Sequence, residues 1–164
     1  MAGQFEEKVV IVTGGSSGIG RAAAVAFAEE GARVTVSARR VEESEETVRL
    51  IKDADGEAIF VQADVSVEAD CERTVTETLD AFGRLDCAFN NAGRVGGGGT
   101  VDCDVAVWNQ VLAVNLTGVL MSMKYQIPQM IEQGGAIVNN ASILGLSGRR
   151  EAQPTLRANM GWSG

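Results

Sequence analysis

The sequence predicts a doubly wound α/β domain, in which helices pack on both faces of a parallel sheet. Short runs of β-branched and apolar residues alternate with segments of helical periodicity, which indicates repeated strand–helix–strand units with right-handed crossovers. The length of 164 residues is that of one ordinary domain, and no linker, repeat or low-complexity tract divides it.

Five strands and four helices follow from these patterns. The first strand, KVVIVT, is a β-branched run typical of a strand that is buried on both faces. Gly31 and Gly56 close the first two helices, and the second helix begins with acidic residues, as a solvated helix does. In chain order we expect strand 8–13, helix 19–31, strand 33–38, helix 41–56, strand 57–64, helix 71–82, strand and turn 85–93, helix 108–123 and strand 135–142.

Composition and charge narrow the class of protein. Apolar residues make up 45% of the chain and charged residues 22%, as in a soluble globular domain. The net charge of −8 argues against nucleic acid as a main partner, because duplex binding needs a basic face. The first residues lack the pattern of a signal peptide, and no apolar run approaches the roughly 20 residues of a membrane span. We therefore expect a cytoplasmic protein without a membrane partner.

Metal and disulfide sites are not expected. Cys71, Cys87 and Cys103 are odd in number and widely spread, which is typical of free thiols in a reducing compartment. The chain contains no histidine, so it lacks both the commonest metal ligand and the commonest general base.

A glycine-rich turn, TGGSSGIG at 13–20, lies between the first strand and the first helix. Gly14, Gly18 and Gly20 would let the backbone turn tightly and approach a pyrophosphate, while the helix N-terminus supplies N–H donors and the positive end of its dipole. The alternative is a plain glycine-rich turn without a ligand. A strand before the turn and a helix after it are the context that dinucleotide binding requires, so we favour a phosphate-binding turn.

Several motifs in this order resemble the short-chain dehydrogenase/reductase family. The motifs are the T-G-x-x-x-G-x-G turn, NNAG at 90–93, the long helix that carries Asn115, and NNAS ending at Ser142. The resemblance runs from about Lys8 to Pro154. It implies a Rossmann fold over residues 1–154, a bound NAD(P) cofactor, and hydride transfer between that cofactor and a small alcohol or carbonyl substrate.

The corner after the second strand bears on the choice of cofactor. NAD-selective sites often place a carboxylate there for the ribose 2′-hydroxyl, whereas an arginine suits the 2′-phosphate of NADP. Here the corner reads Ser37, Ala38, Arg39, Arg40, and Arg39 is placed to meet a phosphate with its planar guanidinium. We expect NADP(H) to be favoured, with NAD(H) as the second choice. In the alternative, both arginines only pair with the acidic helix that follows.

The resemblance implies a full set of cofactor-binding residues. Asp64 and Val65 would border the adenine, and Asn91, Ala92 and Gly93 would line the adenosine ribose side. The complete set is Gly14, Ser16, Ser17, Gly18, Ile19, Gly20, Arg39, Asp64, Val65, Asn91, Ala92 and Gly93.

Two residues are candidates for catalytic roles. Asn115 is an amide on a mostly apolar helical stripe, and on that ground alone it would be a hydrogen-bonded core asparagine. In the family, the asparagine in this setting holds a helix bend and a proton-relay water. Ser142 on its own would be a cap or turn residue. The family's serine at this place donates a hydrogen bond to the substrate oxygen.

The family's tyrosine acid/base and the lysine four residues after it have no match here. Thr155 and Asn159 stand at the expected positions, and Tyr125 lies on the long helix instead. Deleting one base from one coding of a family-like Tyr-x-x-x-Lys segment reproduces residues 155–164 followed by a stop codon. We therefore expect a frame-shifted, C-terminally incomplete enzyme with a non-family tail at 155–164 and with little or no turnover. Reading the coding DNA would test this.

Two further segments concern the surface of the protein. The glycine-rich stretch 94–100 is either a mobile rim of the active site or a plain connector. The apolar stripe from Trp108 to Met123 lies on a helix that commonly forms the dimer interface in the family. We therefore expect a homo-oligomer that forms through the helix carrying Asn115.

Overall fold

The computed structural model of the chain describes residues 3–96 and 101–142. Five parallel strands form one sheet in the order β3-β2-β1-β4-β5. Their bounds are β1 Val9–Thr13, β2 Arg33–Ala38, β3 Glu57–Gln62, β4 Cys87–Asn90 and β5 Ala136–Asn139. Because the strand order changes direction at β1, the crevice beyond its carboxyl end is where a doubly wound sheet places a ligand.

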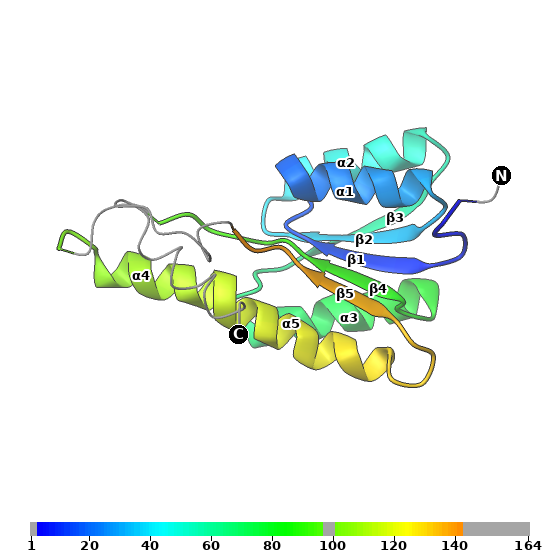
Figure 1. The fold of residues 1–164 in the computed structure, drawn as a ribbon. Helices are drawn as coiled ribbons and strands as arrows, with labels where there is room; N and C mark the ends of the chain where they lie inside the picture. The colour runs from blue at the N-terminus through cyan, green and yellow to red at the C-terminus, as the bar shows by residue number, and fades with distance from the viewer. Residues whose placement is uncertain (1–2, 97–100, 143–164) are drawn as a thin grey trace.

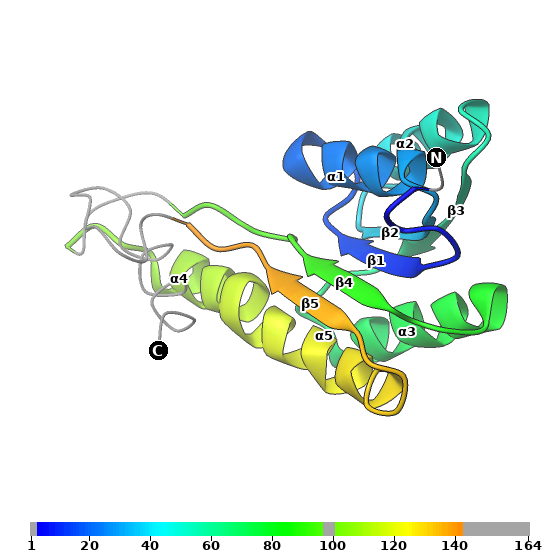
Figure 2. The same cartoon turned by 45° about the vertical axis from the view of Figure 1, so that its right-hand side comes forward.

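Helices cover both faces of this sheet. The described helices are α1 Gly18–Glu29, α2 Val41–Asp53, α3 Glu68–Phe82, α4 Val105–Leu112, the π-helical turn η1 Ala113–Thr117, α5 Gly118–Gln126 and the 3₁₀ turn η2 Ile127–Gln129. α1 and α2 lie on one face, whereas α3 and α5 lie on the other (Figures 1 and 2). The prediction of a doubly wound parallel sheet is confirmed.

The core lies on both faces of β1, whose five residues are all buried. Successive side chains of a strand point to opposite faces of the sheet, so β1 contributes to both layers. Val10 and Val12 pack with Val36 of β2 beneath α1 and α2, whereas Ile11 packs with Val75 of α3. Burial on both faces explains why the sequence of β1 is an unbroken apolar run.

Several element ends differ from the sequence expectations. The second helix stops at Asp53, because Asp55 adopts a left-handed backbone conformation with a φ of 61°. The fifth strand ends at Asn139 instead of 142. The long helix begins at Val105 instead of 108, where the side chain of Asp104 caps it by accepting a backbone N–H.

The helical segment Val105–Gln129 corrects one expectation from the sequence. Its 25 residues contain a window with a mean hydropathy of 1.4, so by length and composition alone it could cross a membrane. The expectation that no apolar stretch approaches that length is therefore wrong. A core helix of a soluble protein has the same properties, and the α5 part of this segment packs against α3.

Candidate functional site

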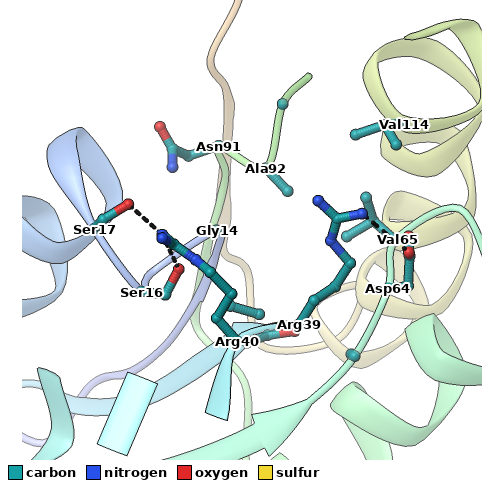
Figure 3. A pocket seen from close by; sticks show the side chains of 14 residues that line it. Gly14, Ser16, Ser17, Arg39, Arg40, Asp64, Val65, Asn91, Ala92 and Val114 are labelled. Carbon is teal, nitrogen blue, oxygen red and sulfur yellow. Dashed lines mark hydrogen bonds and ion pairs between the residues drawn. The ribbon is translucent and has the colours of Figure 1, made fainter. Parts of the chain in front are cut away.

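A cavity of about 330 Å³ lies at the carboxyl ends of β1, β2, β3 and β4. Figure 3 shows its walls, which are the turn before α1, the corners after β2 and β3, and the loop after β4. The residues predicted from the sequence that line it are Gly14, Ser16, Ser17, Arg39, Asp64, Val65, Asn91, Ala92 and Gly93. Residues from four separate segments of the chain thus share one cavity.

The turn between β1 and α1 is shaped by its glycines. Gly14 and Gly18 adopt left-handed backbone conformations, with φ angles of 69° and 53°, which favour glycine. A Cβ added to Gly20 would lie 2.2 Å from the carbonyl oxygen of Gly14, so the first turn of α1 can approach only without a side chain. A Cβ added to Gly18 would meet no described atom within 4 Å. This open backbone at a helix N-terminus fits a pyrophosphate.

Two side chains anchor the turn from its protein side. Arg21 of α1 donates from Nη2 to the carbonyl oxygens of Ser16, at 2.7 Å, and of Glu43, at 2.8 Å. Thr47 of α2 donates from Oγ1 to the carbonyl oxygen of Gly15 at 3.0 Å. These carbonyl groups are engaged by both helices, and the hydroxyl-bearing side of the turn is left to line the cavity.

The loop after β4 is tied to β1 by Thr13. The Oγ1 of Thr13 accepts hydrogen bonds from the backbone N–H groups of Asn91 and Ala92, both at 3.0 Å. The Asn91 side chain donates to the Thr13 carbonyl oxygen at 3.2 Å and accepts from Asn140 at 2.9 Å. The wall opposite the arginine corner is therefore fixed to the ends of β1 and β5.

Arg39, which follows β2, forms an ion pair with Asp64, which follows β3. The Arg39 Nη1 and Asp64 Oδ2 atoms are 3.6 Å apart. Burial opposes ionisation of Asp64, but hydrogen bonds from the hydroxyl and N–H of Ser66, together with the charge of Arg39, outweigh burial and lower the pKa of Asp64. Asp64 is therefore ionised at neutral pH and holds Arg39 beside it.

Arg40 points away from Arg39 and toward the turn before α1 (Figure 3). Its Nη2 donates to the hydroxyl oxygens of Ser16, at 2.9 Å, and Ser17, at 2.6 Å. Its Nη1 pairs with the Glu43 carboxylate at 3.2 Å. The alternative in which both arginines only pair with the acidic helix is thus correct for the Arg40–Glu43 pair and wrong for Arg39.

Some predicted residues lie outside the cavity lining, and some lining residues were not predicted. The predicted residues outside it are Gly18, Ile19, Gly20, Asn115 and Ser142. The lining residues missing from the prediction are Ser37, Ala38, Arg40, Ala63 and Val114. Four of the latter stand at or directly after the ends of β2 and β3, a position that could have found them. Val114 comes from η1, and nothing in the sequence pattern indicates it.

Asn115 lies within η1 and clamps the loop after β4. Its Oδ1 accepts a hydrogen bond from the Arg94 N–H at 2.8 Å, and its Nδ2 donates to the Arg94 carbonyl oxygen at 2.9 Å. The side-chain amide thus pairs with one backbone residue in both directions. This contact connects the π-helical turn to the loop that carries Asn91 and Ala92.

Replacing Asn115 with alanine is expected to release this loop. Hydrogen exchange at the Arg94 amide should become at least about tenfold faster, because one hydrogen bond contributes about 1 kcal/mol to the stability of the closed state. Exchange measured by NMR checks this, and Asn109→Ala, at an exposed position of α4, is the matched control. Unchanged exchange at Arg94 would show that the clamp does not hold the loop.

The remaining catalytic expectations are placed only in part. Ser142 lies three residues beyond β5 and is half-buried. Tyr125 donates its hydroxyl to Glu68 of α3 at 3.1 Å and does not line the cavity. Burial, and then the Glu68 carboxylate, raise the pKa of Tyr125, which makes it less suited to act as a base. Thr155 and Asn159, like most of the glycine-rich stretch, lie outside the described residues.

The cysteines are free thiols in the described parts of the chain. Cys71 is buried, Cys87 and Cys103 are half-buried, and burial raises the pKa values of the Cys71 and Cys87 thiols. Within residues 3–96 and 101–142, no group of three or more Cys, Asp or Glu side chains could hold a metal ion.

Known proteins identify the family. A sequence model described as short chain dehydrogenase matches residues 8–154. An uncharacterised oxidoreductase of Thermotoga maritima is 45% identical over 138 residues, which are 84% of this chain and 54% of that protein. The cyclohexanol dehydrogenase of an Acinetobacter strain is 36% identical over an alignment that covers 100% of this chain and 66% of that enzyme.

Solved structures agree with these sequence matches. The crystal structure of levodione reductase superposes with a TM-score of 0.92 and 34% identity, covering 96% of this chain and 63% of that one. A short-chain dehydrogenase/reductase from Burkholderia xenovorans gives a TM-score of 0.93 with 38% identity, covering 98% and 66%. The chain thus spans roughly half to two thirds of the length of these relatives. It belongs to the short-chain dehydrogenase/reductase family, whose members are NAD(P)(H)-dependent oxidoreductases.

Proposed function

We propose that this chain binds NADP(H) in preference to NAD(H), and that the whole protein transfers hydride between NADP(H) and a small alcohol or carbonyl substrate. The observation that carries the proposal is that the glycine turn and two arginines face one cavity. A carboxylate at the end of β2, which would favour the 2′-hydroxyl of NAD, is replaced by Ala38. The names of the relatives, such as cyclohexanol dehydrogenase and levodione reductase, support an alcohol or carbonyl substrate.

The residues of the chain would divide the binding work. The turn at Gly14 and Gly18 would hold the pyrophosphate at the N-terminus of α1, and the corner at Arg39 and Arg40 would hold the 2′-phosphate. Asp64, with its neighbour Val65, would border the adenine. The bound nicotinamide would supply or accept the hydride, while the protein positions the two reactants.

Asn115 and Ser142 would serve the substrate side of the site. Ser142 would donate its hydroxyl hydrogen bond to the reacting oxygen of the substrate. Asn115 would act through the backbone of the loop after β4, which its amide clamps at Arg94. Both roles follow from the family, and the clamp gives Asn115 a physical reason to keep the loop in place.

The turnover of this chain is expected to be low. Thr155 and Asn159 stand where the family has its tyrosine and lysine, and loss of such a proton-transfer group typically slows the reaction about 10²- to 10⁴-fold. Tyr125 does not substitute, because its hydroxyl faces Glu68 on α3. We place the protein in the cytoplasm, with a small-molecule partner and no nucleic-acid partner, in keeping with its net charge of −8.

A fluorescence titration of the purified chain with NADPH, and in parallel with NADH, tests the proposal. We expect saturable binding of both, with NADPH at least about tenfold tighter, since a charge-assisted hydrogen bond to the extra phosphate contributes about 1.5 kcal/mol or more. Absence of binding to either dinucleotide would refute dinucleotide binding by this chain. Equal affinities would refute the preference alone.

A second candidate function is that of a self-associating, non-catalytic module. The outer side of the long helix carries an apolar row in which Leu120 is 60% exposed and Ile127 is 46% exposed. Exposed apolar rows of this kind drive association between protein chains. We propose that two copies associate through this helix.

Replacing Leu120 with glutamate is expected to prevent that association. A charged carboxylate at the centre of an apolar contact costs several kcal/mol, so light scattering should report a monomer at concentrations where the unchanged chain is dimeric. Leu50→Glu, at a 38% exposed position of α2, is the matched control and should leave the dimer intact. A monomeric unchanged chain, or a dimeric Leu120→Glu variant, would exclude this interface.

A further inference from the structure

We propose that Arg40, together with the hydroxyl groups of Ser16 and Ser17, forms the subsite for the 2′-phosphate, and that Arg39 does not carry the cofactor selectivity. The inference rests on the proposed function, because it assigns one group of the same dinucleotide. It also differs from the sequence interpretation, which placed the phosphate at Arg39. The argument depends on where the two guanidinium groups point and on which charges stand beside them.

The charges that line the cavity favour Arg40. Among the described residues that line it, the charged side chains are Arg39, Arg40 and Asp64. Arg39 and Asp64 form an ion pair across the ends of β2 and β3, so their charges largely cancel. The carboxylate that pairs with Arg40 belongs to Glu43, which does not line the cavity. The net positive charge of the cavity lining therefore resides at Arg40.

The position of Asp64 disfavours a phosphate at Arg39. Its pKa is lowered, so the carboxylate is ionised at neutral pH. A phosphate that approached Arg39 would also approach this carboxylate, 3.6 Å from the guanidinium, and like charges at such a distance repel. Arg39 is better placed to lie against the flat face of the adenine, which is the same in NADP and NAD.

Arg40 lies within a cluster of hydrogen-bond donors. Its Nη2 donates to Ser16 Oγ at 2.9 Å and to Ser17 Oγ at 2.6 Å. A hydroxyl group that accepts a hydrogen bond still has its own hydrogen to donate. Two hydroxyl groups and one guanidinium therefore point at one region, and a phosphate monoester is the acceptor that such a donor set suits. The turn holds this arrangement because Arg21 fixes the Ser16 carbonyl from behind.

Titrations of single variants with NADPH and NADH separate the two arginines. Arg40→Ala should raise the Kd for NADPH about 10- to 100-fold and change the Kd for NADH by less than about threefold, since NADH lacks the 2′-phosphate. Arg39→Ala should weaken both cofactors by similar factors. Arg40→Lys keeps the charge but loses the planar fork, so its NADPH affinity should lie between those of the Arg40→Ala variant and the unchanged chain.

Controls keep the test decisive. Arg49→Ala removes an exposed arginine from the same helix, paired with Glu46 and Asp53, and should change neither affinity. Ser17→Ala should weaken NADPH selectively even if the Arg40 variants fail to fold. Selective loss of NADPH affinity in Arg39→Ala but not in Arg40→Ala would overturn the assignment while leaving the proposed function intact. Lack of binding by the unchanged chain would overturn both.

Discussion

Replacing Gly20 with alanine is expected to abolish dinucleotide binding and to destabilise the fold. A Cβ at this position would lie 2.2 Å from the carbonyl oxygen of Gly14 and 2.6 Å from Asn91 Nδ2. The carbonyl group cannot yield without moving the turn, and the turn is tied to Ser37 through the Gly14 N–H at 2.7 Å. We expect a loss of about 3 kcal/mol in the free energy of unfolding, at the upper end of overpacking effects, and a Kd for NADPH raised at least about 100-fold.

The expected sign of this change makes the test sharp. Within an ordinary exposed helix, glycine to alanine stabilises by about 1 kcal/mol, because alanine is the better helix former. Gly83→Ala, at the C-cap of α3, is the control: Gly83 has a φ of 77°, and an added Cβ meets no described atom within 4 Å. That change should cost about 1 kcal/mol and leave NADPH binding unaltered. A Gly20→Ala variant as stable as the unchanged chain would contradict the close approach.

The sequence was sufficient for features that depend on neighbours along the chain. The apolar run of β1 indicated a strand buried on both faces, since a strand covered by two helical layers has no polar side. The glycines of the turn were informative because a left-handed backbone and a close approach both restrict the residue type. The confirmed fold class follows from such local signals, repeated in alternation.

Features set by contacts between distant segments could not be predicted in the same way. Arg39 and Arg40 are adjacent in sequence, yet Asp64 after β3 holds one and the serines before α1 hold the other. The π-helical turn around Asn115 gives no periodic signal, since it interrupts a helix whose apolar pattern continues. The element ends at Asp53 and Asn139 were misplaced because backbone conformation, more than residue type, ended them.

A second large effect is expected at Asp86, a buried carboxylate on the side of the sheet away from the cavity. Its Oδ2 accepts the Val9 N–H at 3.0 Å and the Arg84 Nε–H at 2.8 Å, and its Oδ1 lies 3.5 Å from Lys8 Nζ. Asp86→Ala would leave the Val9 N–H of the central strand buried without an acceptor. We expect a loss of about 2–3 kcal/mol, because a buried unsatisfied donor costs about 1–3 kcal/mol and the charge-assisted bonds are lost with it.

Urea unfolding measures this loss, and Asp53→Ala is the matched control. Asp53 pairs with Arg49 on the exposed side of α2, so its removal should change the free energy of unfolding by less than about 1 kcal/mol. The midpoint should fall for Asp86→Ala while the slope stays constant, since the surface exposed on unfolding is nearly unchanged. A midpoint equal to that of Asp53→Ala would show that the buried carboxylate contributes no more than an exposed one.

The effect of Asp86 should also depend on pH in a definite direction. Burial opposes its ionisation, but hydrogen bonds from Arg84 and the Val9 N–H, with the charges of Arg84 and Lys8, lower its pKa below the ordinary value of 3.8. A carboxyl group with a lowered folded-state pKa stabilises the fold above its unfolded-state pKa, and that contribution is lost as the pH falls through the folded-state value. The difference in unfolding free energy between the unchanged chain and Asp86→Ala should therefore be largest near pH 7 and should narrow below about pH 4. Asp64 and Glu68 also have lowered pKa values, so the variant should remain acid-sensitive, though less so. A difference that stays constant from pH 7 to pH 3 would mean that the loss arises from packing and not from the carboxylate charge.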